Sequence, residues 1–373
     1  MGMGNKSNKT SLLANNTNIK KELKINKYDF RDLSDKITNE SLRELKNVHT
    51  IILSACIKIT DYGLKYLQGV HTIDLSSCIL ITNTGLAYLK GVQKIDLSGC
   101  EQITNEGLKY LEGVVEIDLW NCNISNEGLK HLKGVKKIHI GNCDKITNDG
   151  LQYLKGVHTI NLAECNISDL QYLKGVHTIN LTNCYEINDN CLEHLIGVHT
   201  INLTNCKLIT NNGLKHLKGV HTINLTNCFK ITNDGLRYLT GVYKINLSNC
   251  IQITNEGLKY LKGVEIIDLW SCNKITNECL EYLQNVVDID LRYCNQITNE
   301  GLKYLTKVKI ISLTNKQVTN EGLEYLKNAT NIDFYNCNKI TNEGIQILKN
   351  TTCYFYNCSN ISRIDCTSYN IKF

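Results

Sequence analysis

The chain contains no proline and only two tryptophans among its 373 residues. No run of apolar residues approaches the ~18 that a membrane-spanning helix needs, and residues 1–20 hold no apolar stretch long enough for a secretory signal. We therefore expect neither a membrane anchor nor secretion, and a cytoplasmic location that keeps thiols reduced. The net charge of +5 is small for this length, so we expect neither nucleic acid nor a membrane as the partner.

Sequence motifs of catalysis are also missing. The chain has no phosphate-binding G-x-x-x-x-G-K-[ST] loop, no G-x-S-x-G nucleophile turn and no zinc-binding H-E-x-x-H helix. Its 18 cysteines include no C-x-x-C pair, which zinc ribbons and redox sites require. We predict that the protein is not an enzyme and that it holds no metal and no other cofactor.

What the chain has in abundance is repetition. A pattern V-x-x-I-x-L-x-x-C-x-x-I-T-N-x-G-L-x-x-L recurs, most often every 22 residues, as between Cys56 and Cys78. It predicts fifteen repeats, of which one carries Lys316 in place of the cysteine. The cysteines that mark the other fourteen are Cys56, Cys78, Cys100, Cys122, Cys143, Cys165, Cys184, Cys206, Cys228, Cys250, Cys272, Cys294, Cys337 and Cys358.

Each repeat combines two periods. Ile73 and Leu75 alternate with polar residues, which predicts a short strand with one buried face. Leu86 and Leu89 are three residues apart, which predicts a helical turn with its apolar edge towards the same interior. One repeat cannot bury so small an apolar set alone, so neighbouring repeats must stack into a continuous core with parallel strands.

Local signals mark both ends of the helical turn. Thr82 or Asn83 can cap its beginning, because either side chain can accept a bond from a free backbone N–H. Gly91 suits the left-handed conformation that ends such a turn. The cysteines are expected to be structural, since a small thiol near the end of a strand fills the core.

The spacing L-x-x-L-x-L-x-x-C is that of the cysteine-containing variant of the leucine-rich repeat. The chain resembles the repeat domain of F-box/leucine-rich-repeat adaptors of ubiquitin ligases. Its Asn-rich, proline-free L-K-G-V-H-T-I-N-L-T-N-C style also resembles the leucine-rich-repeat proteins of giant DNA viruses of amoebae, such as mimivirus-like proteins. The resemblance covers about residues 28–366. It implies an α/β leucine-rich-repeat solenoid, a curved horseshoe with a parallel sheet on the concave side and short helical turns on the convex side.

The ends of the chain differ from its middle. We expect residues 1–27 to be a polar, disordered segment and residues 28–47 to be an amino-terminal cap without a clear strand pattern. Residues 48–350 form the repeat array, and residues 351–373 a degenerate last repeat and cap. One internal step is short, because Cys165 and Cys184 are only 19 residues apart, and we expect this to change the local curvature.

A column of histidines at the second position of several repeats admits two interpretations. Stacked imidazoles can bind a metal or respond to pH. However, the stretch GVHTINL is copied verbatim four times, and this copying explains the column more simply. The four histidines are His158, His177, His199 and His221.

The concave face is the candidate binding site. Aspartates end the strands near both ends of the array, and we expect Lys94 and Lys137 to offset their repulsion on one side and Arg292 on the other. Trp120 and Trp270 interrupt a column of small residues and are expected on the solvent side, where tryptophan often anchors a partner. The alternative is that each indole lies flat across neighbouring strands. The predicted partner-binding residues are Asp96, Glu116, Asp118, Trp120, Asp268, Trp270, Asp290, Arg292 and Tyr335.

These features favour a monomeric, non-enzymatic scaffold that binds a protein partner. One alternative is the substrate-recognition subunit of a ubiquitin ligase, but residues 1–27 are too short and polar for an F-box, so a separate recruiter would be needed. Another alternative is a structural or virion component, which the near-identical repeats favour. In the viral case the expected location is the host-cell cytoplasm.

Overall fold

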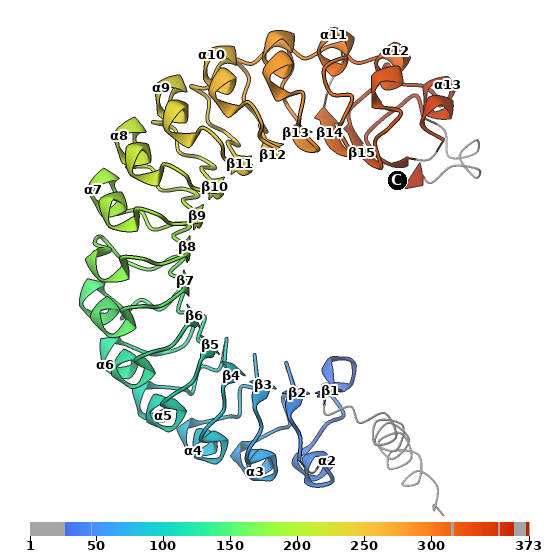
Figure 1. Ribbon diagram of the computed structural model, residues 1–373. Helices are drawn as coiled ribbons and strands as arrows, with labels where there is room; N and C mark the ends of the chain where they lie inside the picture. Colours follow the sequence, from blue (N-terminus) through green and yellow to red (C-terminus); the bar gives the residue numbers. More distant parts are fainter. Residues whose placement is uncertain (1–26, 46, 315–316, 350, 362–370, 373) are drawn as a thin grey trace, which may run out of the picture. The chain divides into compact units, whose positions relative to one another are not determined.

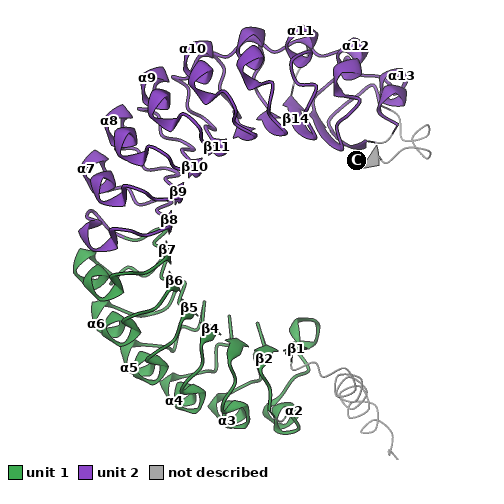
Figure 2. Ribbon diagram, viewed as in Figure 1, with its two compact units in different colours: residues 1–165 green, residues 166–373 purple. Residues whose placement is uncertain are grey.

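The computed structural model describes residues 27–45, 47–314, 317–349, 351–361 and 371–372. The chain divides into two compact units, residues 1–165 and 166–373 (Figure 2). The boundary falls at the beginning of the 19-residue step after Cys165. The expected disorder of residues 1–27 lies outside the described residues except at Lys27, and Lys316 and Cys366 also lie outside them.

Unit 1 is a stack of short strands and helical turns. All its strand pairs in the described residues are parallel and in register, with Ile73 opposite Ile95 and Ile95 opposite Ile117. Its strands are β1 (Lys27–Asp29), β2 (Thr50–Ile52), β3 (Thr72–Asp74), β4 (Lys94–Asp96), β5 (Glu116–Asp118), β6 (Lys137–His139) and β7 (Thr159–Asn161). Its helical turns are η1 (Arg31–Leu33), α2 (Asn39–Arg43), α3 (Asp61–Leu64), η2 (Lys65–Leu67), α4 (Asn83–Leu86), η3 (Ala87–Leu89), α5 (Asn105–Leu108), η4 (Lys109–Leu111), α6 (Asn126–Leu129), η5 (Lys130–Leu132) and η6 (Asn148–Leu154).

Unit 2 repeats the same plan with longer strands towards its end. Its strands are β8 (Thr178–Asn180), β9 (Thr200–Asn202), β10 (Thr222–Asn224), β11 (Lys244–Asn246), β12 (Ile266–Asp268), β13 (Asp288–Leu291), β14 (Ile310–Thr314), β15 (Asn331–Tyr335), β16 (Thr352–Tyr356) and β17 (Ile371–Lys372). They also pair in parallel. Its helical turns are η7 (Gln171–Leu173), α7 (Asp189–Leu192), η8 (Glu193–Leu195), α8 (Asn211–Leu214), η9 (Lys215–Leu217), α9 (Asn233–Leu236), η10 (Arg237–Leu239), α10 (Asn255–Leu258), η11 (Lys259–Leu261), η12 (Asn277–Leu283), α11 (Asn299–Leu302), α12 (Asn320–Leu323), η13 (Glu324–Leu326), α13 (Asn342–Ile345) and η14 (Gln346–Leu348).

Within each unit the strands line the inner side of a curved stack and the helical turns form its outer side (Figure 1). The predicted strand and turn residues are all in the core, since Ile73, Leu75, Leu86 and Leu89 are at most 1% exposed. Burying each such side chain contributes roughly 1.5–3 kcal/mol. The prediction of a leucine-rich-repeat solenoid with parallel strands and short helical turns is therefore confirmed.

The I-T-N-x-G part of the repeat joins each helical turn to the next repeat. Asn83 Nδ2 donates to Thr104 Oγ1 over 2.8 Å, and Asn83 Oδ1 accepts the Thr104 N–H over 3.0 Å. A Cβ on Gly107 would lie 2.5 Å from the same Oδ1, so the glycine lets the asparagine approach closely; Cys279 takes the equivalent place in its own repeat. Thr82 caps its own turn by accepting from Thr84 N–H, as expected. Asn83 does not cap its turn but links two repeats.

The amino-terminal cap departs from expectation. The strand β1 pairs with β2 in parallel, with Tyr28 opposite Ile51, although its sequence lacks the repeat pattern. Pairing with the edge of β2 satisfies backbone groups that would otherwise be left open, so position in the stack outweighs local pattern. Among the described residues, no helix has the length and apolar character needed to cross a membrane.

Candidate functional site

The cysteine ladder belongs to the core. Cys78 Sγ donates to the Leu53 carbonyl over 3.1 Å, and Cys100 Sγ makes the same bond with Leu75. Burial raises the pKa of Cys78 to about 12 and that of Cys100 to about 11. Thiols held neutral and hydrogen-bonded in this way are poor nucleophiles. No group of three or more metal-ligating side chains occurs in the described part of the chain.

On the strand face, a column of aspartate and asparagine side chains lies at the ends of the short strands. Asp74 Oδ1 accepts the N–H of Ser76 over 2.9 Å, and Asn202 Oδ1 accepts the N–H of Thr204 over the same distance. Asparagine and aspartate serve equally here because the turn needs one acceptor oxygen. The alternation of the two residue types along the column therefore changes the charge of this face without changing its backbone.

The acidic part of unit 1 is only partly neutralised. Burial raises the pKa of Asp96, and the neighbouring Asp118 and Asp74 raise it further. Lys94 forms an ion pair with Glu116 in the adjacent column, with Nζ 2.6 Å from Oε1. Among the described residues Lys137 forms no ion pair. The ion pair of Lys94 lies one column away from the aspartates, so their compensation by Lys94 and Lys137 stays a prediction.

Trp120 packs on the strand face instead of standing free in solvent. A Cβ on Gly141 would lie 2.3 Å from Trp120 Cζ3 and 2.8 Å from the Ala163 carbonyl oxygen, so the indole lies directly over this glycine. Many other repeats have serine or threonine in the place of Gly141 and Ala163, as at Ser98 and Thr182. The geometry matches the alternative in which the indole lies flat across neighbouring strands, while its outer face remains open.

His139 completes this cluster. Its Nδ1 lies 2.8 Å from Asp118 Oδ2, and its ring centroid lies 5.0 Å from that of Trp120. Asp118 also accepts the backbone N–H of Trp120, so one carboxylate holds both the His139 ring and the turn that carries Trp120. We call Asp118, Trp120, His139 and Gly141 the Trp120 cluster. Sequence analysis missed Gly141, although a glycine within a column of hydroxyl residues was a visible signal.

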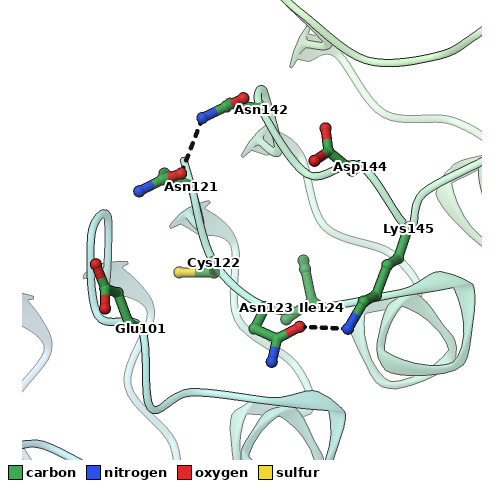
Figure 3. Close-up of a pocket in the computed structure, with 8 residues that line it drawn as sticks. All are labelled: Glu101, Asn121, Cys122, Asn123, Ile124, Asn142, Asp144 and Lys145. Carbon is green, nitrogen blue, oxygen red and sulfur yellow. Dashed lines mark hydrogen bonds between the residues drawn. The ribbon is translucent and has the colours of Figure 1, made fainter.

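A hollow of about 250 Å³ lies beside this cluster, at the edge where the strands end (Figure 3). The repeat of Cys122 has one residue fewer than its neighbours between cysteine and isoleucine, which leaves a notch between longer loops. Lys145 Nζ donates to Asn123 Oδ1 over 2.7 Å across it. The notch is open to solvent and large enough to hold ordered water molecules. It is lined by Glu101, Asn121, Cys122, Asn123, Ile124, Asn142, Asp144 and Lys145.

Unit 2 carries an aromatic and cationic group on its strand face. Trp270 meets Tyr293 edge-to-face with ring centroids 6.2 Å apart. Arg292 binds the Asp290 carboxylate, with Nη2 2.6 Å from Oδ2, and its Cζ lies 5.0 Å from the Tyr335 ring centroid. The predicted pairing of Arg292 with the aspartates is thus confirmed. Tyr335 in turn stacks on Tyr356 at 4.4 Å. We call Trp270, Arg292, Tyr293, Tyr335 and Tyr356 the aromatic platform.

Three carboxylates around the platform form no ion pair with a described residue, although the charge of Lys244 lowers the pKa of one of them, Asp288. Burial raises the pKa of Asp268, Asp288 and Asp333, because partial loss of water disfavours the charged form. The guanidinium of Arg292 lowers the pKa of Asp268 and Asp333 only in part, since it is bound to Asp290. The platform therefore presents negative potential next to exposed aromatic faces.

The predicted site residues separate into two groups. Asp96, Glu116, Asp118 and Trp120 lie in unit 1. Asp268, Trp270, Asp290, Arg292 and Tyr335 lie in unit 2. Within each unit they share the strand face. Their role in binding stays a prediction.

The histidine column forms a stack. The rings of His177 and His199, and those of His199 and His221, are parallel with centroids 4.5 Å apart. Each Nδ1 lies near the hydroxyl of the following threonine, at 3.3 Å for His221. Parallel rings direct their nitrogens side by side, which does not suit chelation of one ion, so the stacking favours the structural interpretation.

A profile of the family described as "Leucine Rich repeat" matches residues 92–111 and 282–306. No curated protein matches the chain. The matched stretches include the helical turn of one repeat in each unit.

Solved structures share the fold. A chain of the yeast Rad7 and Elc1 complex is 18% identical, with a TM-score of 0.53, and the match covers 92% of this chain and 96% of that one. A leucine-rich-repeat protein of Leptospira interrogans is 15% identical, with a TM-score of 0.52 and coverage of 83% and 97%. A chain of the TLR13–ssRNA13 complex is 16% identical, with a TM-score of 0.59, and 90% of this chain matches 52% of its length. The present chain thus spans about half of the TLR13 chain.

Proposed function

We propose that this chain is a non-catalytic scaffold that binds a basic segment of a protein partner on the strand face of its repeats. The observation that carries the proposal is the aromatic platform of unit 2 with Asp268 and Asp333 beside it. Their carboxylates are partly dehydrated, and the cation nearest to them, Arg292, is bound to Asp290. A lysine or arginine of a partner would neutralise them and stack on the tyrosine faces, and a cation over an aromatic ring contributes about 0.5–2 kcal/mol.

Two solved structures of the same fold were determined as complexes with another protein, namely Rad7 with Elc1 and Toll with Spatzle. Another, TLR13, was determined with single-stranded RNA. The aspartates around the aromatic platform repel phosphates, which favours a protein partner over RNA at that place.

The test uses a labelled peptide of alternating arginine and serine, and a twin with glutamate in place of arginine. We expect the arginine peptide to bind at least about tenfold more tightly in fluorescence anisotropy. The double variant Asp268→Asn, Asp333→Asn should lose that preference. Asparagine keeps the acceptor oxygen, as Asn202 and Asn224 do in their own repeats, so the fold is retained.

Glu256→Gln is the matched control, because Glu256 lies on the helical side and pairs with Lys259. Its replacement removes one of the two negative charges that the double variant removes, and it leaves the strand face intact. Equal binding of both peptides, or a preference that survives the double variant and is lost with Glu256→Gln, contradicts the proposal.

A role as the substrate-recognition subunit of a ubiquitin ligase is a second candidate. It is supported by the resemblance to F-box/leucine-rich-repeat adaptors. Reconstitution with Skp1 and a cullin tests it, and the absence of a complex on size-exclusion chromatography would remove it. A role as a virion component is a third candidate. Detection of the chain in purified virus particles would support this role, and its absence from them would remove it.

We also propose a reducing compartment such as the cytoplasm. No cysteine in the described residues forms a disulfide bond. Most of the ladder thiols donate a hydrogen bond to a neighbouring carbonyl, as Cys228 does to Leu203, and a disulfide would remove this bond.

A further inference from the structure

A row of exposed apolar side chains follows the strands β8 to β11 of unit 2. Each stands one or two residues after the buried cysteine of its repeat, and each exposes between 39% and 56% of its surface. Apolar side chains exposed on successive repeats mark interaction sites more often than residues scattered singly do. The four residues, which we call the apolar stripe, are Tyr185, Leu208, Phe229 and Ile251.

The spacing of the stripe is fixed by backbone hydrogen bonds. Asn183 N–H donates to the Thr204 carbonyl over 2.9 Å, and Asn205 N–H donates to the Thr226 carbonyl over the same distance. These bonds keep the repeats in register up to the residue before each cysteine. Neighbouring repeats there are ~4.8 Å apart, so the four residues span about 14 Å.

This span decides between two kinds of peptide. An α-helix presents one apolar residue per turn of ~5.4 Å, so four of them at i, i+4, i+7 and i+11 span about 16 Å. An extended strand presents alternate residues ~6.7 Å apart, so four span about 20 Å. The span of four apolar residues on a helix is about 2 Å longer than the stripe, and that on a strand is about 6 Å longer. The length of the stripe therefore fits a helix laid across the repeats better than a strand.

The charges beside the stripe are mainly positive. Lys207 and Lys230 stand next to Leu208 and Phe229, and neither forms an ion pair with any described residue. Glu186 is the single acidic residue that directly adjoins the four stripe positions in sequence. A ligand with acidic side chains on either side of its apolar row would therefore be favoured over a basic one.

We propose that the apolar stripe is a docking site for an amphipathic helix of a partner protein, with Asp and Glu on its polar face and apolar residues at i, i+4, i+7 and i+11. This surface lies at the edge where the strands end and is separate from the strand face, so the proposal does not depend on the proposed function. Charge selectivity is opposite at the two surfaces, since the strand face favours a basic segment.

The probe is a labelled helical peptide of roughly 15 residues, about four turns. It carries leucine at the four stated positions, glutamate on its flanks and alanine elsewhere, and its twin carries lysine for glutamate. We expect the glutamate peptide to bind at least about tenfold more tightly than its twin in fluorescence anisotropy. Phe229→Glu should weaken it by about tenfold or more, because it removes the central apolar contact and repels the flanks.

Ile196→Glu is the matched control. Ile196 is 67% exposed at the end of η8 on the helical side, so this variant makes the same chemical change away from the stripe. Thermal melts establish that both variants are folded. The proposal is overturned if neither peptide binds at millimolar concentrations, if both bind equally, or if Phe229→Glu has no effect. It is also overturned if the chain self-associates in sedimentation and Phe229→Glu abolishes this, since the occupant is then a second copy.

Discussion

At the scale of single residues, aspartate and asparagine on the strand face make the same hydrogen bond to the backbone but differ in the charge that they give the surface. The residue that ends each strand must offer one acceptor oxygen, which Asp74 and Asn202 both do. The turn therefore tolerates exchange of the two, and the charge of the face can change repeat by repeat at little cost to the fold. Similarly, Trp120 has room only because Gly141 has no side chain.

Gly141→Ala should destabilise the protein by about 1–3 kcal/mol, because the added methyl group would overlap the Trp120 ring and force it out. Urea unfolding measures the change in the free energy of unfolding. In a Trp270→Phe background the remaining indole fluorescence should shift to longer wavelength as the ring enters water.

The double variant Trp120→Ala, Gly141→Ala provides the control. Once the indole is absent, alanine at position 141 should cost less than it does beside Trp120, with a remaining cost from the Ala163 carbonyl oxygen 2.8 Å from the added Cβ. The two substitutions should therefore couple favourably in a double-mutant cycle. Simple additivity of the two effects would contradict the described packing.

At the scale of elements, the helical turn of one repeat is held by the next. Asn233 Nδ2 donates to Thr254 Oγ1 over 2.8 Å, and its Oδ1 accepts the Thr254 N–H over 3.0 Å. Asp189 makes the corresponding pair of bonds with Thr210. The threonine hydroxyl accepts a hydrogen bond from the asparagine amide, but it donates one to the aspartate carboxylate. A carboxylate can therefore replace the amide at this position.

Asn233→Ala should lower the free energy of unfolding by about 1–3 kcal/mol, because it leaves two polar groups of Thr254 without their partner. Asn233→Asp should cost much less, following the example of Asp189. Urea unfolding of the two variants tests this, and an equal loss for both would mean that the inter-repeat bonds contribute little.

The sequence predicted these elements unevenly. The spacing of Ile73 and Leu75 predicted the strand, and that of Leu86 and Leu89 predicted the helical turn. A buried face requires apolar residues at regular intervals that can be read directly from the sequence. The bonds of Asn83 escaped prediction, since their partner lies 21 residues away in a different repeat. A local capping rule could not distinguish the two roles.

The candidate site was predicted in the same uneven way. The aspartates and tryptophans stood out by residue type, and the ion pair of Arg292 with Asp290 followed from their proximity in the sequence. The aromatic neighbours of Arg292 and the glycine under Trp120 required knowledge of which repeats touch.

At the scale of the whole molecule, the buried thiols link stability to alkaline pH. Burial raises the pKa of Cys56 to about 11 and that of Cys143 to about 12. The ordinary thiol pKa is about 8.5, so above that pH the unfolded chain releases protons that the folded chain retains. Their contribution to stability is fully present below pH 8.5 and is lost as the pH rises towards the pKa of the folded state.

The melting temperature should therefore stay constant from pH 7 to 8 and fall steeply from pH 9 to 10.5 in the presence of a reductant. At pH 10 each such thiol costs roughly 2 kcal/mol of folding free energy. Circular dichroism melts measure this. Lysine and tyrosine also titrate there, so Cys100→Ala isolates the thiol contribution, since Cys100 has a pKa raised to about 11. A variant with an unchanged slope would contradict the mechanism.

Most bonds of the cysteine ladder join one repeat to the one before it, 25 residues back in the case of Cys250 and Leu225. A copied repeat therefore carries a thiol that can donate to the leucine carbonyl of the preceding repeat. It also carries a leucine carbonyl that can accept from the thiol of the following repeat. If a whole repeat is duplicated or lost during replication, the same hydrogen bonds can still form between the repeats that become neighbours. The array can thus lengthen or shorten by unequal recombination, and its near-verbatim middle is what recent growth of that kind would leave behind.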